Sequence, residues 1–157
     1  MKKKRAKMGI FGNLLYRLKQ VYTFENKLIK DLKYDHRELF SIFEKIKKMA
    51  QKEKYEKIPA LLQKFHYQYR MHIIYEDNYF YTYLKNRYHD DPKILKFITQ
   101  KQAEMHEISN VIAGFVERFS NIKEVEKDAF KKELDKLAKA LTKRIEFEEK
   151  ELYTLYA

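Results

Sequence analysis

The sequence predicts an all-α protein, folded as an antiparallel up-down-up-down four-helix bundle. The chain has only 3 Gly and 2 Pro among its 157 residues, so little in it breaks a helix. Four long stretches carry apolar residues at alternating steps of three and four, the spacing of a helix that buries one stripe. Short polar segments separate these stretches, as in an up-down bundle with short loops.

The chain is predicted to divide into an N-terminal segment, residues 1–24, and the bundle, residues 25–157. Residues 1–7 form a basic tail, and residues 8–24 place apolar side chains on one side of a helix. We expect this second part to be a short amphipathic helix across one end of the bundle, although a helix lying on a membrane surface would show a similar pattern. No apolar run has the length of a membrane span.

The bundle helices are predicted from residue patterns and end signals. The first covers about residues 25–51 and the second about residues 55–88. The third has Pro92 in its first turn, Asp90 or Asp91 as its N-cap, and ends near residue 120. The fourth covers about residues 123–156. The buried stripe of the second helix is predicted to contain Ile58, Leu62, Phe65, Tyr69, His72, Glu76, Tyr79 and Tyr83.

Ionisable residues interrupt each of the four stripes near the middle of the helix. They are His36 on the first helix, His72 and Glu76 on the second, His106 on the third, and Arg144 and Glu148 on the fourth. Mid-helix positions of an antiparallel bundle meet in one layer, and polar groups buried there need partners. Imidazole and carboxylate ligands together suit iron, manganese or zinc. The simpler alternative is a buried hydrogen-bonded pair of His72 and Glu76.

The ordered set resembles the hemerythrin-like superfamily in its HHE form. That pattern has one histidine on the first helix, His-x-x-x-Glu on the second, one histidine on the third and His-x-x-x-Glu on the fourth. The matching segments are His36, HIIYE at residues 72–76, His106, and RIEFE at residues 144–148. The resemblance implies non-haem iron, one or two ions, and a role in handling or sensing oxygen, nitric oxide, iron or redox state. The ligands would be His36, His72, Glu76, His106 and Glu148.

Arg144 departs from this pattern because it stands where the family has its fourth histidine, and a guanidinium does not bind metal. The site would then hold two ions with water in the gap, or one ion. Alternatively the protein is metal-free, with Arg144 paired to Glu76 or Glu148. Tyr69 and Tyr79 share the stripe of His72 and are candidate donors to the ligands.

The metal-free alternative has a resemblance of its own. The last helix is similar to that of the regulator-of-sigma-D family, which binds a transcription factor. The matching positions are Phe130, Leu134, Ala140, Leu141, Arg144, Glu148 and Leu152. The basic region of a sigma factor would, however, repel a chain with a net charge of +11.

Composition limits the remaining function classes. The chain has no Cys, which excludes disulfides and thiolate metal sites and fits a reducing cytoplasm, where we expect the protein. No catalytic triad or phosphate-binding glycine loop occurs, so we do not predict an enzyme unless it acts through its metal. The expected partners are a small ligand such as oxygen or nitric oxide, or a protein such as a transcription factor, and not nucleic acid.

Overall fold

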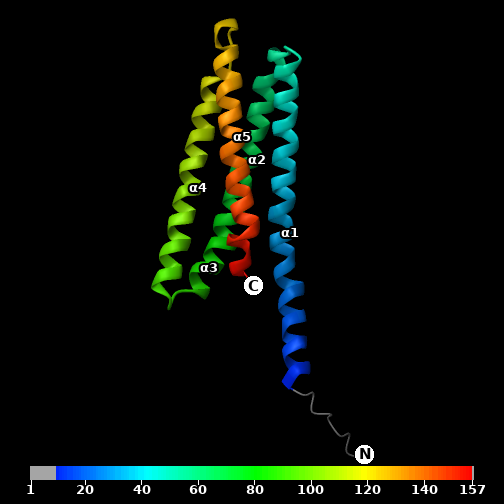
Figure 1. Ribbon diagram of the computed structural model, residues 1–157, viewed down its shortest axis with the longest axis vertical. Coiled ribbons are helices and arrows are strands. Elements are labelled where there is room, and N and C mark those ends of the chain that lie inside the picture. Colours follow the sequence, from blue (N-terminus) through cyan, green and yellow to red (C-terminus); the bar gives the residue numbers. More distant parts are fainter. Residues whose placement is uncertain (1–9, 157) are drawn as a thin grey trace, which may run out of the picture.

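The computed structural model describes the backbone of residues 10–156 and the side chains of residues 27–156. The predicted basic tail at residues 1–7 lies outside this part of the chain. The described residues form an antiparallel four-helix bundle with no strand, which confirms the predicted fold class (Figure 1). Within them, no helix carries an apolar stretch of the length needed to cross a bilayer.

Two α-helices make up the second arm of the bundle, so its four arms contain five α-helices. They are α1 (Ile10–Gln51), α2 (Ile58–Tyr75), α3 (Thr82–Arg87), α4 (Pro92–Arg118) and α5 (Lys127–Lys150). Short 3₁₀ turns cover Tyr55–Lys57, Glu124–Glu126 and Leu152–Tyr156, and a π-helical segment, Glu76–Tyr81, joins α2 to α3. Asp91 caps α4 by accepting hydrogen bonds from the N–H groups of Lys93 and Ile94, as predicted.

The separate N-terminal helix that we predicted is instead the first part of α1. This helix continues without a break from Ile10 to Gln51, and Figure 1 shows it extending past the ends of the other helices rather than crossing them. No Gly or Pro occurs between residues 13 and 58, so nothing in the sequence ends the helix near residue 24. The side chains of residues 10–26 lie outside the described part.

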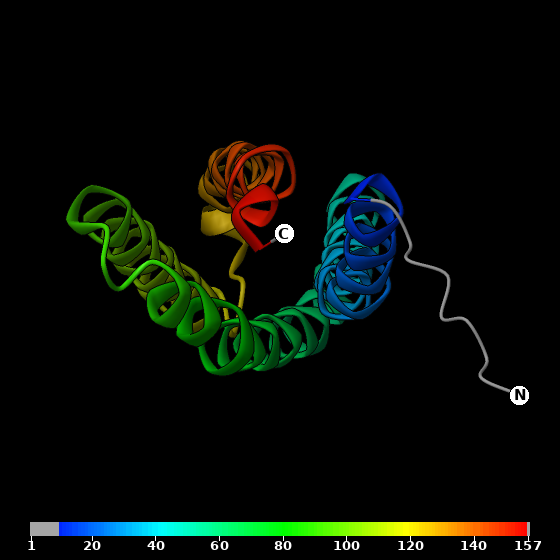
Figure 2. The same ribbon diagram turned by 90° about the horizontal axis from the view of Figure 1, so that it is seen from below.

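The helices surround a core that is divided into two apolar clusters. Viewed along the bundle, α1, α2 and α4 follow a curve, and α5 lies on its open side (Figure 2). One cluster contains Leu39, Phe65 and Leu141, and the other contains Leu32 and Leu152. On α1 and α5 the buried ionisable residues lie in sequence between the two clusters, and on the second arm Glu76 does so. The predicted polar layer therefore separates two hydrophobic cores.

The π-helical segment begins at this polar layer and changes the register of the second arm. The N–H of Thr82 donates to the carbonyl of Asp77, five residues earlier, so this turn contains one more residue than an α-helical turn. The first buried positions after Glu76 are Phe80 and Tyr81, which are 0% and 1% exposed. Our placement of Tyr79 on the buried stripe was wrong, because its side chain is 58% exposed.

Candidate metal centre

Five polar or charged residues are buried in the part of the chain that the structure describes, and all five come from the predicted set. They are His36 from α1, His72 and Glu76 from the second arm, and Arg144 and Glu148 from α5. Each is at most 7% exposed. The packing of α1 and α5 against the second arm thus brings ionisable groups from three arms into one buried layer.

His36, His72 and Glu148 form the tightest group within this layer. Each offers one ligand atom, and these atoms all lie within 4.8 Å of one another. Two ligand atoms bound to the same ion at 2.0–2.2 Å are separated by at most about 4.4 Å. Only small side-chain movements would therefore bring the three atoms onto one ion. Glu76 lies beside this group and outside it.

Carboxylates outside the group orient both imidazole rings. The Nδ1 atom of His36 lies 2.8 Å from Oε1 of Glu149, and Nδ1 of His72 lies 3.3 Å from Oδ2 of Asp35. A histidine that donates from Nδ1 to a carboxylate keeps the lone pair of Nε2 for a metal, and such outer carboxylates fix the tautomer of metal-binding histidines. The two rings are therefore prepared to bind through Nε2.

Three buried atoms at the centre lack a hydrogen-bond partner among the described residues. They are Nε2 of His72, Oε2 of Glu76 and Oε2 of Glu148. The last of these lies 3.2 Å from Nε2 of His36, within ion-pair range but without the geometry of a hydrogen bond. Buried polar atoms without partners are rare and indicate an ion or water. Two of these atoms belong to His72 and Glu148, members of the tight group, and lone pairs brought together there fit a cation.

The two buried glutamates differ in their charge state. Burial and the neighbouring Glu148 raise the pKa of Glu76 well above its usual value, which favours its protonated form. Burial also acts to raise the pKa of Glu148, but the close contact with His36 and the charge of Arg144 outweigh burial and lower the pKa. For His36, the same contact with Glu148 outweighs burial and raises the pKa. Without metal, Glu148 thus lies between the guanidinium of Arg144 and the ring of His36, and both contacts favour its ionised form.

Three contacts position the Arg144 side chain in the buried layer. Its Nε donates to Oε1 of Glu148 at 2.6 Å, and one terminal nitrogen donates to the hydroxyl of Tyr81 at 2.8 Å. The other terminal nitrogen lies 3.8 Å from Oε2 of Glu104. The structure therefore shows the predicted ion pair between Arg144 and Glu148.

Three of the candidate site residues lie away from the group. The side chain of His106 is 55% exposed, and its Nε2 lies 2.8 Å from Oδ2 of Asp77. Met105 occupies the buried position instead, and Tyr69 donates its hydroxyl hydrogen bond to Sδ of Met105 rather than to a histidine. Tyr79 packs against Tyr75 at the surface, with the two rings tilted relative to each other. The expectation that His106 and Tyr79 face the centre was wrong.

Two tyrosines reach the centre that the sequence did not single out. Tyr153 donates to Oε1 of Glu76 at 3.0 Å, and its hydroxyl lies 3.3 Å from Nε2 of His36. Tyr81 accepts from Arg144. Tyr153 lies five residues after Glu148, in the final 3₁₀ turn, and Tyr81 lies five residues after Glu76. An α-helical period does not place either tyrosine on the stripe, so it gave no signal for them.

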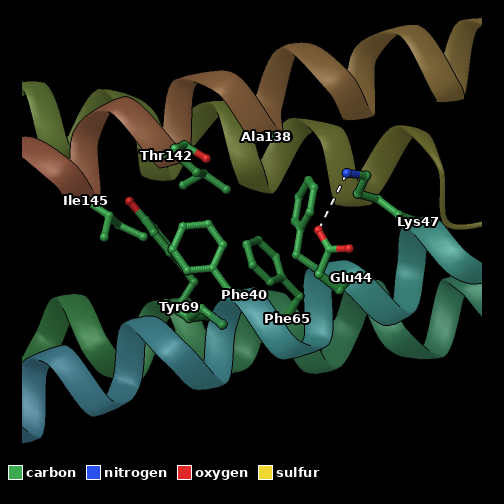
Figure 3. Close-up of a pocket in the computed structure, with 11 residues that line it drawn as sticks. Phe40, Glu44, Lys47, Phe65, Tyr69, Ala138, Thr142 and Ile145 are labelled. Atoms are coloured by element: carbon green, nitrogen blue, oxygen red, sulfur yellow. Dashed lines mark hydrogen bonds and ion pairs between the residues drawn. The ribbon is translucent and has the colours of Figure 1, made fainter.

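A mainly apolar pocket lies between α1 and α5, beside the centre (Figure 3). Its volume is about 100 Å³, and its lining includes Phe40, Phe43 and Phe65. Leu141 and Ile145 line it from α5, one turn or less from Arg144. The ion pair of Glu44 and Lys47, 3.5 Å apart, lies at one side. The pocket therefore places apolar space of small-molecule size near the polar layer.

Comparison with known families gives the same classification as the fold and the buried layer. The hemerythrin HHE cation binding domain matches residues 27–156, so the chain belongs to this family. No curated protein and no solved structure matches the chain. The family assignment confirms the predicted resemblance and defines a cation-binding domain; the resemblance to the regulator-of-sigma-D family is weaker.

Proposed function

We propose that this protein binds non-haem iron at His36, His72 and Glu148 and uses it to sense or carry a small diatomic ligand such as oxygen or nitric oxide. The observation that carries this proposal is the group of three residues whose ligand atoms lie within 4.8 Å of one another, two of which, His72 and Glu148, each have a buried atom without a hydrogen bond. Two histidines and one carboxylate with further positions open are typical of non-haem iron(II). When bound, such an ion supplies the redox and ligand-binding chemistry that no side chain here has.

The apolar pocket beside the centre favours a small, nonpolar ligand. The pocket of about 100 Å³ is large enough for a diatomic molecule and offers it phenylalanine and leucine side chains. Apolar cavities take up small nonpolar molecules in preference to water. A reducing cytoplasm, which suits a protein without cysteine, is the compartment that we propose.

The test is elemental analysis of protein produced in iron-supplemented medium and dialysed without chelator. We expect iron to remain bound in near-stoichiometric amount, because the three ligand atoms are buried and preoriented. Protein from manganese- and zinc-supplemented cultures provides the comparison of metals. Clearly substoichiometric metal from all three cultures would contradict the proposal.

The outer carboxylates provide a second prediction. Asp35→Asn and Glu149→Gln should each lower the affinity for iron(II) by roughly 10–100-fold, the usual effect of losing a carboxylate behind a metal-binding histidine. Glu38→Gln on α1 and Glu146→Gln on α5 are matched controls, because both side chains are exposed. Anaerobic competition with a chelator measures the affinities. Equal affinities in all four variants would mean that Asp35 and Glu149 do not orient the rings.

A metal-free protein-binding module is the second candidate. The buried ion pair of Arg144 and Glu148 favours it, because this pair neutralises a carboxylate without any metal. It leaves the unpartnered atoms of His72 and Glu76 unexplained, so we place it second. The metal analysis distinguishes the two functions. If no metal binds, a pull-down with an RNA polymerase sigma subunit is the next experiment.

A further inference from the structure

Arg144 occupies the position of the fourth-helix histidine in the family pattern, and its side chain is always positively charged. A guanidinium stays protonated in proteins and has no lone pair for a metal. Burial acts to lower the pKa of Arg144, but the charge of Glu148 outweighs this effect and raises the pKa. Arg144 is therefore a permanent positive charge in the polar layer.

The guanidinium is fixed on several sides. Glu148 and Tyr81 hold two of its nitrogens by hydrogen bonds of 2.6 and 2.8 Å. Glu104 lies 3.8 Å from the third nitrogen and is itself bound to Lys101. A side chain held in this way does not swing aside at little cost, because each of these contacts would be lost.

Each of the two buried glutamates at the centre uses one carboxylate oxygen in a hydrogen bond and leaves the other oxygen without one. Glu148 gives Oε1 to Arg144 and leaves Oε2 toward His36. Glu76 gives Oε1 to the hydroxyl of Tyr153 and leaves Oε2 without a partner. The free oxygens, with Nε2 of His72, are the buried unpartnered atoms of the centre. Arg144 thus satisfies one end of Glu148, and the other end faces the histidine group.

The remaining histidine of the family pattern cannot complete a second metal site. His106 points outward and is bound to Asp77 at 2.8 Å. A second ion would lack both His106 and the fourth-helix histidine, whose position Arg144 occupies. It would also lie close to the positive charge of Arg144, which repels it. The residues present therefore fit one ion and do not fit two.

We propose that the centre holds a single ion, and that the Arg144 guanidinium permanently takes the place of a second one. The inference rests on the proposed function, because it concerns the number of ions in the same centre. The single ion belongs to His36, His72 and Glu148, and Arg144 compensates the charge that a second ion would otherwise neutralise on Glu148.

The number of ions per chain tests this inference. Purified wild-type protein, Arg144→Lys and Arg144→His are saturated with iron(II) without oxygen, freed of excess metal and analysed for metal content, with circular dichroism as the check on folding. We expect one ion in the wild type and in Arg144→Lys, which keeps the cation. Arg144→His removes the fixed charge and adds an imidazole four residues before Glu148, so we expect its content to rise toward two.

The outcomes separate the inference from the proposed function. Two ions in the wild type would overturn the single-ion inference and leave the function standing. One ion in a folded Arg144→His protein would also overturn it, because the arginine would then not be what limits the number. No ion in the wild type would overturn both. Electron paramagnetic resonance of the oxidised proteins gives a second readout, since an isolated ferric ion gives a signal that a coupled ferric pair does not.

Discussion

Replacing Arg144 with alanine is expected to lower the free energy of unfolding of the metal-free protein by about 3–5 kcal/mol, the range for stranding the partner of a buried ion pair. The substitution leaves the carboxylate of Glu148, which is 0% exposed, without its strongest compensating charge. It also removes the partner of the Tyr81 hydroxyl. Urea unfolding, with the m-value checked for constancy, measures the change.

A matched control and a rescue make this prediction specific. Lys143 is the neighbouring cation on α5 and is exposed, so Lys143→Ala should change the free energy of unfolding by less than about 0.5 kcal/mol. Adding Glu148→Gln to Arg144→Ala should restore part of the lost stability, because it removes the stranded charge. A loss below about 1 kcal/mol in Arg144→Ala would show that the pair behaves as a solvated surface contact.

The layer of buried ionisable residues was predictable because burial on a regular helix follows a fixed period. His36, His72, Glu76, Arg144 and Glu148 are the buried polar or charged residues of the described chain, and each was placed on a stripe from the sequence. The spacing of three and four is enough for this purpose wherever the helix stays regular. Both α1 and α5 are regular through the centre.

Beyond the π-helical turn, the α-helical period no longer predicts which side chains are buried. One extra residue rotates everything after it by about 100° relative to the preceding helix. Tyr79 therefore turns outward, while Tyr81 turns inward to meet Arg144. No residue type in EDNYFY requires a wide turn, so this change depends on the packing of the whole bundle. The turn begins at Glu76, which is consistent with the frequent location of such turns at functional sites.

On the third arm, the sequence left open which of two neighbouring residues faces inward. Met105 and His106 are consecutive, and their side chains differ by about 100° around α4. The apolar pattern is compatible with either one facing inward. Packing settles the choice, because Met105 is 2% exposed and accepts the hydrogen bond of Tyr69, whereas His106 is bound to Asp77 at the surface. A hydrophobic side chain gains more from that buried position than an imidazole without a partner.

Alanine substitutions at His72 and at His106 should therefore have different effects on the affinity for iron(II). His72→Ala is expected to lower the affinity for iron(II) by more than the roughly 100-fold upper range for outer carboxylates, because it removes a ligand and not its support. His106→Ala should leave the affinity unchanged, since its ring lies outside the group and is 55% exposed. Anaerobic chelator competition on the two folded variants and the wild type gives the three affinities. If His106→Ala loses iron as strongly as His72→Ala does, then α4 turns this histidine inward when metal binds, and the ligand set includes the third arm.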